Sequence, residues 1–475
     1  MSVTKDTAEE LYQQDELFRD TIATVDEQGK RIWLYPKKPK GRYHNRRIIV
    51  TVILLTLLFG LPLIEVNGHP FMLFNFFERQ FIIFGVAFWP QDFHIFLIAT
   101  IALFVFIILF TVVFGRLWCG WACPQTIFME MVFRKIEYWI EGDSIRQKKL
   151  DQAPWTGKKI FKKATKHIIF VAIALLIAHT LMSYLIGFDQ VKEIISSPPA
   201  EHMAGFIGMV FFTGVFYFVF SYLREQACVA ICPYGRLQGV LLVKESIVVA
   251  YDWIRGEPKG RLKRGKIQEG NGDCIACKRC VHVCPTGIDI RNGTQLECVN
   301  CTACMDACDD VMDTVGRPKG LIRYASHTSI EEGKKKLFSP RVAGYSVVLI
   351  AILGLLVVLL ATRNDVETSV RRVPGTLYQE QDNGMISNLY NLKFINKTFE
   401  EKTLEVRIKE EDGRIRGVTD ENIQIESNAN AEGVYFIEFP KEKVNKAKTD
   451  ITVQVLENGE VVDEVTTNFL GPLKF

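Results

Sequence analysis

Long apolar runs alternate with polar segments along this chain of 475 residues. An α-helix needs about 20 consecutive apolar residues to cross the hydrocarbon core of a bilayer. Five runs meet this requirement and are predicted to span a membrane: Ile48–Ile64, Phe93–Phe114, Ile168–Gly187, Ala204–Leu223 and Val342–Thr362. Residues 71–90 are also apolar, but Glu78 and Arg79 interrupt them. We therefore expect this sixth stretch to lie at the membrane interface and not to span the membrane.

From about Arg372 the pattern changes to short runs of alternating apolar and polar positions. Leu404–Ile408 and Thr452–Val455 are typical of half-buried β-strands. Asp412-Gly413 and Asn458-Gly459 are turn signals between such strands. The pattern predicts a small all-β domain, an immunoglobulin-like sandwich without a disulfide.

Eight of the 12 cysteines form two runs with the spacing C-x2-C-x2-C-x3-C. In bacterial two-cluster ferredoxins with this spacing, the fourth cysteine of each run binds the other cluster. One [4Fe–4S] cluster is thus predicted on Cys274, Cys277, Cys280 and Cys308, and a second on Cys298, Cys301, Cys304 and Cys284. Two structural zinc sites are the alternative, because C-x2-C pairs also bind zinc. Pro285, directly after the first run, favours iron–sulfur.

The remaining four cysteines form a repeated C-x3-C-P motif. Cys119 and Cys123 follow the second span, and Cys228 and Cys232 follow the fourth, 109 residues later in both cases. Two parallel repeats of this kind would bring the four thiols together at one face of the membrane. Such thiolates are soft ligands suited to Cu(I) or zinc, and buried structural thiols are the alternative.

The proline after each second cysteine suits the first position of a helix. Cys123 and Cys232 would then lie at helix N-termini, where the helix dipole favours thiolate over thiol. Arg116 and Arg224 would place a cation near each pair. Pro124 is predicted to begin an amphipathic helix with one apolar face: Ile127, Phe128, Met131, Val132, Ile136, Trp139 and Ile140.

Lysine and arginine gather in the loop between the second and third spans, whereas residues 66–92 and 188–203 carry only Arg79 and Lys192. By the positive-inside rule, the N-terminus and the ferredoxin-like part lie in the cytoplasm and the β domain lies outside. Free thiols and oxygen-sensitive clusters agree with a reducing cytoplasm. The net charge of +3 gives no reason to expect nucleic acid as a partner.

The predicted fold is thus a multi-pass α-helical membrane protein with a cytoplasmic two-cluster ferredoxin-like domain and a C-terminal all-β domain. Its parts are a cytoplasmic N-terminal segment (1–45), a four-span membrane core (46–245), a ferredoxin-like domain (246–340), a fifth transmembrane helix (341–362) and a periplasmic β-sandwich (363–475). His94, His167 and His179 lie in or beside spans; hydrogen-bonded structural histidines are favoured there over ligands of a b-type haem.

Several motifs resemble those of the CcoG/FixG (RdxA) family: G-R-L-W-C-G-W-A-C-P-Q-T, A-C-V-A-I-C-P-Y-G-R-L-Q-G, the ferredoxin run ending in A-C-D-D-V-M-D, G-R-P-K-G-L-I, R-R-V-P-G-T-L-Y and F-L-G-P. The resemblance covers nearly the whole chain after residue 30. It implies an accessory protein of cbb3-type cytochrome c oxidase in the bacterial inner membrane. It also implies cupric reductase activity that supplies Cu(I) to that oxidase. The implied partners are the lipid bilayer, a cytoplasmic electron donor, a copper transporter or chaperone, and oxidase subunits.

Three functional hypotheses follow. In the first, electrons pass from the cytoplasmic donor through the two clusters to Cu(II). The copper ion is held at Cys119, Cys123, Cys228 and Cys232. In the second, the protein is a quinol dehydrogenase like the NapH/NosR group, which shares four spans, both C-x3-C-P motifs and ferredoxin clusters. The fifth span and the β domain favour the first hypothesis. In the third, the β domain is a scaffold that docks oxidase subunits. A homodimer is left open.

Overall fold

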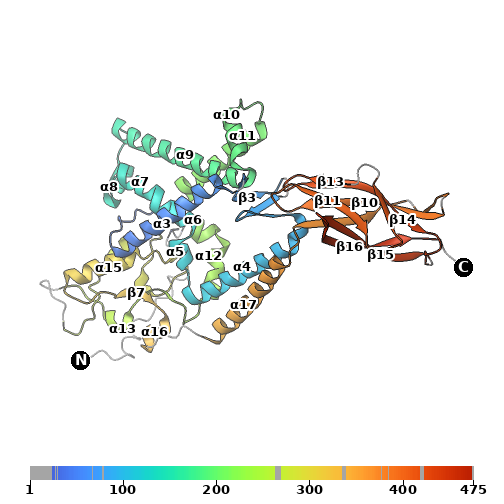
Figure 1. Cartoon of the computed structure of the whole chain (residues 1–475). Helices are drawn as coiled ribbons and strands as arrows, with labels where there is room; N and C mark the ends of the chain where they lie inside the picture. The colour runs from blue at the N-terminus through green and yellow to red at the C-terminus, as the bar shows by residue number, and fades with distance from the viewer. Residues whose placement is uncertain are drawn as a thin grey trace. The chain divides into compact units, whose positions relative to one another are not determined.

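The structure is a computed structural model of the chain (Figure 1). It describes residues 24–26, 28, 30–66, 68–77, 80–262, 269–333, 339–375, 377–382, 384–417, 422–444 and 446–472. The chain divides into two compact units. Unit 1 comprises Met1–Gly60, Ala99–Ser183 and Phe188–Leu353; unit 2 comprises Leu61–Ile98, Tyr184–Gly187 and Gly354–Phe475.

Within the described residues, five helices are long and apolar enough to cross a membrane, as predicted. These segments are Arg42–Leu63 (α3, Arg42–Gly60, and a 3-10 turn), Pro90–Phe114 (containing α4, Phe93–Phe114), Gly157–Ile186 (α9), Met203–Leu223 (α11, Met203–Phe218, and a π-helical turn) and Pro340–Ala361 (α17). Two helices begin before their apolar runs: α3 at Arg42 and α9 at Gly157. The added residues are rich in Lys and Arg, which are good helix formers.

Residues 71–90 form a small antiparallel sheet in unit 2 and no sixth spanning helix. Its strands are β3 (Met72–Asn75), β4 (Gln80–Ile83) and β5 (Val86–Phe88), in that order. Phe84 and Gly85, both with positive φ, form the two-residue turn between β4 and β5. Glu78 and Arg79, which interrupt the apolar run, lie outside the described residues. A two-stranded ribbon, β1 (Glu65–Val66) and β2 (His69–Pro70), precedes this sheet.

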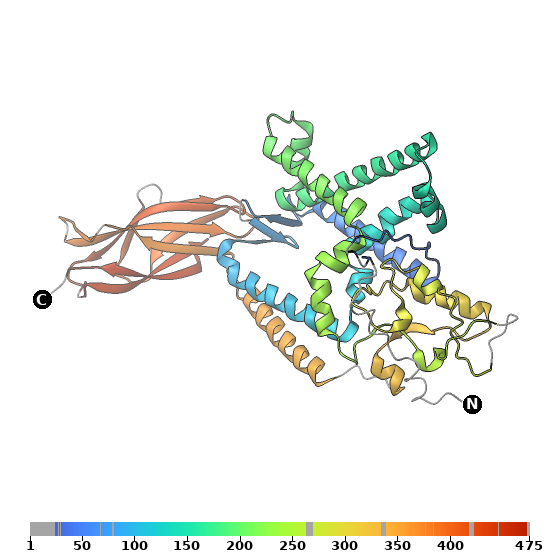
Figure 2. The ribbon, with the colours of Figure 1, turned by 180° about the vertical axis from the view of Figure 1, so that it is seen from behind.

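The C-terminal part of unit 2 has two antiparallel sheets, which confirms the predicted β-sandwich (Figure 2). One sheet has the order β12-β14-β10-β8 with β9 paired to β10, and the other the order β13-β11-β15-β16. The strands are β8 (Val366–Arg372), β9 (Gln379–Glu380), β10 (Met385–Asn396), β11 (Lys402–Ile408), β12 (Arg414–Gly417), β13 (Asn422–Ile425), β14 (Asn430–Pro440), β15 (Lys448–Glu457) and β16 (Glu460–Leu470).

Alternating residues of these strands form one apolar core. Tyr390, Leu392 and Phe394 of β10 are fully buried, as are Val453 and Val455 of β15. Asn458 and Gly459, with φ of 52° and 86°, form the predicted hairpin turn between β15 and β16. All 12 cysteines are free and lie outside this domain, so the sandwich has no disulfide.

In unit 1, shorter elements connect and follow the spans. The helices are α5 (Leu117–Trp121), α6 (Pro124–Thr126), α7 (Arg134–Ile140), α8 (Ser144–Gln152), α10 (Phe188–Ser196), α12 (Pro233–Leu241), α13 (Trp253–Gly256), α14 (Arg279–His282), α15 (Ala303–Thr314) and α16 (His327–Glu331). A β-ribbon, β6 (Val248–Tyr251) paired with β7 (Ile322–Ala325), joins the two ends of the segment that carries both ferredoxin-like runs.

Candidate electron-transfer centre

The two C-x2-C-x2-C-x3-C runs fold as matched loops. Ala276 and Lys278 in the first run have φ of 52° and 57°. Asn300 and Thr302, the equivalent residues 24 positions later, have φ of 52° and 64°. Residues other than glycine rarely adopt this left-handed conformation; they do so in turns and at functional sites. Where right- and left-handed residues alternate, successive backbone N–H groups line a concavity that can bind an anionic group.

The eight cysteines line two cavities. Cys274, Cys277, Cys280 and Cys308 line the first cavity. Cys284, Cys298, Cys301 and Cys304 line the second, which also has Cys280 in its wall. Each cavity thus combines three cysteines of one run with the fourth of the other. The structure brings together the same two sets that the spacing predicts.

This arrangement fits a cluster of several atoms better than a single zinc ion. Within the described parts of the chain, no three His, Cys, Asp or Glu side chains are arranged to hold one metal ion. In a structural zinc site, four ligands lie only about 2.0–2.3 Å from one ion. Burial raises the pKa of Cys298 to about 12 and that of Cys301 to about 11. Metal binding at these thiols must therefore displace protons.

The two C-x3-C-P motifs have nearly the same backbone geometry. Cys123 has φ −63° and ψ 123°, and Cys232 has φ −66° and ψ 112°. Each is the N-cap of a helix that begins at the following proline, as predicted. The residue that follows each preceding span has a positive φ, 55° at Gly115 and 54° at Arg224. The backbone thus repeats at these positions, whereas Cys119 lies in an α-helix and Cys228 in a π-helical turn, Ala227–Ile231.

The helix after the first motif differs from the prediction in its middle turn. Residues Ile127–Phe133 form a π-helix between α6 and α7. The wider turn rotates the later residues about the helix axis, so that Met129 and Phe133 are buried while Trp139 is 79 % exposed. The predicted apolar face is therefore correct for Ile127, Phe128 and Met131 but wrong for Trp139.

The four thiols of the motifs lie in one neighbourhood, and two of them are buried enough for their pKa to change. Burial raises the pKa of Cys119 and raises that of Cys228 to about 12, and both thiols interact electrostatically with Cys123 and Cys232. The Cys119 thiol donates a hydrogen bond to Oε1 of Gln238 (3.3 Å), which also accepts from Nε of Arg116 (2.7 Å). Arg116 is thus the predicted cation beside Cys119. Desolvation raises the pKa of this thiol by more than Arg116 lowers it.

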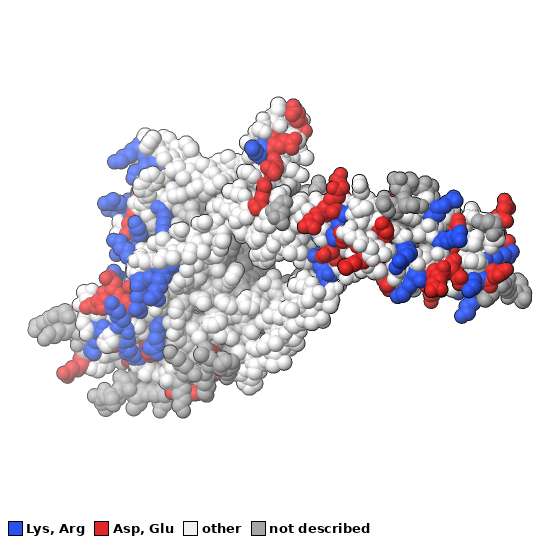
Figure 3. All heavy atoms as spheres, viewed as in Figure 1, with Lys and Arg blue, Asp and Glu red and all other residues white. Residues whose placement is uncertain are grey.

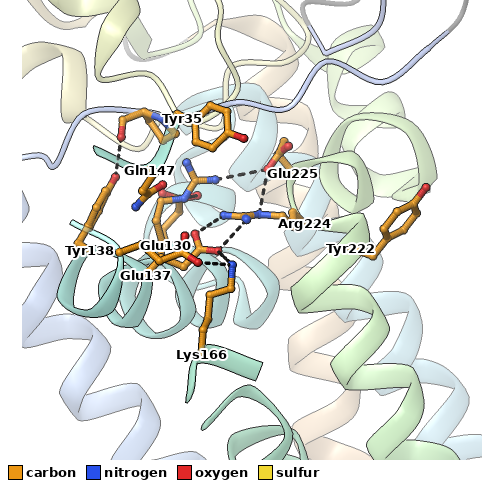
Figure 4. Close-up of polar contacts among 12 residues, drawn as sticks. Tyr35, Glu130, Glu137, Tyr138, Gln147, Lys166, Tyr222, Arg224 and Glu225 are labelled. Atoms are coloured by element: carbon orange, nitrogen blue, oxygen red, sulfur yellow. Dashed lines mark hydrogen bonds and ion pairs between the residues drawn. The ribbon is translucent and has the colours of Figure 1, made fainter. Parts of the chain in front are cut away.

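Arg224 does not serve the second pair as predicted, because it forms a two-pronged ion pair with Glu137. This pair belongs to a buried charge network around the helix that follows the first motif (Figure 4). Figure 4 shows the Arg224 guanidinium between Glu137 and Glu225, with Lys166 reaching Glu137 from another helix. Arg134, 2 % exposed, contacts Glu130 at 3.2 Å and Glu225 at 3.4 Å. The network therefore links the helix after the first motif to Arg224 and Glu225, just before the second motif.

The first motif is in direct contact with the loop that lines the second cavity. Cys119 belongs to one buried apolar cluster with Val299 and Cys301. A Cβ atom on Gly120 would lie only 2.5 Å from the carbonyl oxygen of Asn300, so the two main chains touch. Buried Arg47 joins the same two loops by donating hydrogen bonds to the carbonyl oxygens of Gly120 (2.9 Å) and Cys301 (3.1 Å). The second cavity is therefore the one next to the C-x3-C-P thiols.

The three histidines in or beside spans have ordinary hydrogen-bond partners. Nδ1 of His167 lies 2.9 Å from the Tyr217 hydroxyl. Nδ1 of His179 lies 2.6 Å from the carbonyl oxygen of Leu175, and Nδ1 of His94 lies 3.3 Å from that of Gln91. These contacts agree with structural histidines.

Three family models match the chain. A 4Fe–4S binding domain matches residues 96–150, a 4Fe–4S dicluster domain matches 223–327, and the IG-like fold at the C-terminus of FixG matches 356–472. The chain is 31 % identical to Protein RdxA of Cereibacter sphaeroides over 450 residues, which cover 90 % of this chain and 94 % of RdxA. The chain belongs to the FixG/RdxA family.

Two further relatives show how far the likeness extends. Nitrogen fixation protein FixG of Rhizobium meliloti is 33 % identical over 434 residues, 80 % of each chain. Ferredoxin-type protein NapH of Escherichia coli is 23 % identical over 230 residues, 46 % of this chain and 68 % of NapH. This member of the FixG/RdxA family is a membrane-bound iron–sulfur electron-transfer protein.

Proposed function

We propose that this protein passes single electrons from a cytoplasmic donor to Cu(II) at the C-x3-C-P thiols, and so supplies Cu(I) for assembly of cbb3-type cytochrome c oxidase. The contact of Cys119 and Gly120 with the Cys301 loop carries the proposal, because it joins the proposed copper site to the second cavity. In this account the ferredoxin-like part lies in the cytoplasm and the β-sandwich in the periplasm. The protein is an inner-membrane enzyme of the oxidoreductase class.

The ferredoxin-like part would hold the two resident cofactors. Cys274, Cys277, Cys280 and Cys308 would bind one [4Fe–4S] cluster, and Cys284, Cys298, Cys301 and Cys304 the other. Such a cluster, when bound, accepts and releases one electron at a time. Ile288, Ile290 and Val249 give the second cavity an apolar wall that excludes water. The backbone N–H of Asn300 donates to Cys298 and that of Ala303 donates to Cys301, as suits sulfur ligands of a cluster.

Copper is the substrate at the four remaining thiols. Thiolates bind Cu(I) in preference to Cu(II), so binding there makes reduction of the ion more favourable. Cu(I) accepts as few as two thiolates, which suits a motif that supplies cysteines in pairs. Each turnover adds one electron to Cu(II) and consumes no proton. The buried thiols of Cys119 and Cys228 release their protons when copper binds, because their pKa values are raised.

Metal counting on the full-length protein, purified without oxygen, tests the proposal. Iron and sulfide should each be present at about eight per chain, from two four-iron clusters. Cys119→Ser/Cys123→Ser and Cys228→Ser/Cys232→Ser should keep this iron and lose bound Cu(I). As the matched control, Cys298→Ser/Cys301→Ser should lose about half of the iron and keep the copper. Zinc in place of iron, or copper retained in both C-x3-C-P variants, would contradict the proposal.

A further inference from the structure

The two ends of the ferredoxin-like part differ in exposure. All 12 cysteines lie within the described residues, and Cys277 alone among them is exposed. Cys277 lines the first cavity, beside the exposed Lys278. The second cavity instead faces the buried Cys119. An electron from a soluble donor therefore has its shortest access to the protein at the Cys277 end.

A groove with a volume of ≈ 700 Å³ adjoins the first cavity, and Arg279 lines both. Residues 37–42 form one wall of the groove, and α14 and α15 contribute to the other. The main-chain N–H of Lys37 donates to the carbonyl oxygen of His282 (2.8 Å), which fixes this segment against α14. The Tyr138 hydroxyl donates to the carbonyl oxygen of Pro36 (3.0 Å) and holds the segment from the other side.

The acidic residues of the groove are already engaged within the protein. The Asp306 carboxylate accepts the main-chain N–H groups of Tyr43 and His44, at 3.1 and 2.8 Å. The other acidic side chains have partners as well: Asp309 with the main-chain N–H of Gly320, Asp310 with Arg279, Asp313 with Lys319, and Asp143 with the main-chain N–H groups of Lys38 and Ser144. The groove has five aspartates against six lysines and arginines, so together with the adjoining Lys278 this surface carries a small net positive charge.

The lysines of the groove, by contrast, face solvent. Lys37, Lys38 and Lys40 are exposed, and in the described part of the chain their ammonium groups pair with no acidic side chain. Figure 3 shows Lys and Arg side chains near α15 and the N-terminal end of α3, with Asp and Glu side chains beside them. Lys37, Lys38, Lys40 and the adjoining Lys278 therefore present positive charge that has no acidic partner among the described residues, near the exposed Cys277.

We propose that Cys277, Lys278 and the lysines of the groove form the docking surface for an acidic one-electron carrier protein of the ferredoxin or flavodoxin class. This inference rests on the proposed function and names its electron donor. One electron leaves the reduced carrier, which is oxidised, and enters the protein at the Cys277 end without a proton. Opposite charges on the two surfaces speed encounter and orient the carrier's redox centre towards Cys277. A hydride donor gives up two electrons together, and a flavin would be needed to pass them on one at a time. A one-electron carrier can transfer its electron directly once its redox centre lies close to Cys277.

The test is anaerobic stopped-flow reduction of the full-length protein by a chemically reduced soluble ferredoxin with a large negative net charge. The variant Lys37→Glu/Lys38→Glu reverses two charges of the groove. The control Lys148→Glu/Lys149→Glu reverses two exposed lysines of α8, outside the groove. We expect the second-order rate constant of the groove variant to fall at least about tenfold at low ionic strength, with the difference vanishing at high salt. The control should stay within about twofold of the unmodified protein.

Equal rates for the groove variant and the unmodified protein, or an equal fall in both variants, would overturn the docking surface. Dithionite, a small reductant, provides the second readout. The groove variant reduced by dithionite should convert Cu(II) to Cu(I) as the unmodified protein does. A further outcome separates the two proposals. Ferredoxin could reduce the unmodified protein in a charge-dependent way while the dithionite-reduced protein fails to reduce Cu(II). The proposed function would then fail and the docking surface would stand.

Discussion

Gly120 approaches Asn300 so closely that a Cβ atom at position 120 would lie 2.5 Å from the Asn300 carbonyl oxygen and 2.6 Å from that of Val299. These residues are 180 positions apart in the sequence, and they join the first C-x3-C-P motif to the second ferredoxin-like run. No side chain fits between the two main chains. The glycine therefore sets how near the proposed copper site can be to the second cavity.

Replacing Gly120 by alanine should push these two loops apart. Overpacking of this kind typically costs about 1–3 kcal/mol, so we expect a lower unfolding temperature in detergent and slower electron delivery to copper. Iron content should stay near that of the unmodified protein, because Gly120 lines neither cavity. The control is Gly214→Ala, where an added Cβ meets no atom within 4 Å. Unaltered stability and copper reduction in Gly120→Ala would contradict the close approach.

Arg47→Gln removes a buried cation that holds the same two loops together. Arg47 donates to the Gly120 and Cys301 carbonyl oxygens, and hydrogen bonds from charged groups contribute about 1.5–3 kcal/mol each. We expect the variant to be destabilised by a few kcal/mol on this scale, and the reduction potential of the cluster at Cys301 to fall, because a nearby positive charge is lost. Redox titration followed by electron paramagnetic resonance measures that potential. Arg46→Gln, at an exposed neighbouring position, should shift neither quantity.

The ion pair of Arg224 and Glu137 should make the protein sensitive to acid. Burial alone would raise the pKa of Glu137, but Arg224 and Lys166 lower it below its ordinary value. A carboxyl group whose pKa is lower in the folded state contributes stability above its unfolded pKa, about 4.3, and this stability is lost as the pH falls through the folded value. The unfolding temperature should therefore be flat from neutral pH to about pH 5 and fall below it.

Arg224→Ala removes the main ion-pair partner of Glu137 and leaves its carboxylate buried. Breaking a buried ion pair in this way typically lowers the free energy of unfolding by about 3–5 kcal/mol. In this variant the loss of stability should already be present at neutral pH, measured by thermal unfolding in detergent. The comparison is Lys393→Ala in the exposed pair with Glu432, where a loss below about 1 kcal/mol is expected. A loss of similar size in both variants would show that the buried network stabilises the protein no more than an exposed pair does.

Local patterns predicted most of the architecture correctly. The five spans and the hairpin turn at Asn458-Gly459 depend on residues close together in the sequence, where length and composition decide the outcome. The grouping of cysteines around the two cavities follows from spacing within 35 residues, Cys274 to Cys308.

Long-range contacts and burial could not be predicted in this way. The approach of Cys119 to Cys301 depends on tertiary packing across 182 positions, for which the sequence has no local signal. Glu137 looks like an ordinary surface charge until the fold buries it against Arg224, and Glu130 until it pairs with the buried Arg134. The predicted thiolates at Cys123 and Cys232 stay a prediction, whereas burial raises the pKa of Cys119 and Cys228 by desolvation, which the sequence does not reveal.

The proposed sidedness has a direct test at exposed positions. A cysteine at Lys443, in the β-sandwich, should react with an impermeant maleimide added to intact spheroplasts. A cysteine at Lys148, on α8, should react only after the membrane is opened. Labelling of position 148 but not of position 443 in intact spheroplasts would reverse the orientation.

A single-turnover experiment tests the central claim most directly. The protein is reduced by dithionite without oxygen, freed of excess reductant and mixed with Cu(II), and the Cu(I) formed is read with a chromogenic chelator while the cluster absorbance is followed. The unmodified protein should form up to about two Cu(I) per chain, one for each cluster electron. Cys119→Ser/Cys123→Ser and Cys228→Ser/Cys232→Ser should keep their clusters reduced and form almost none. Native rates of Cu(I) formation in both variants would contradict the account, because copper would then receive its electron elsewhere.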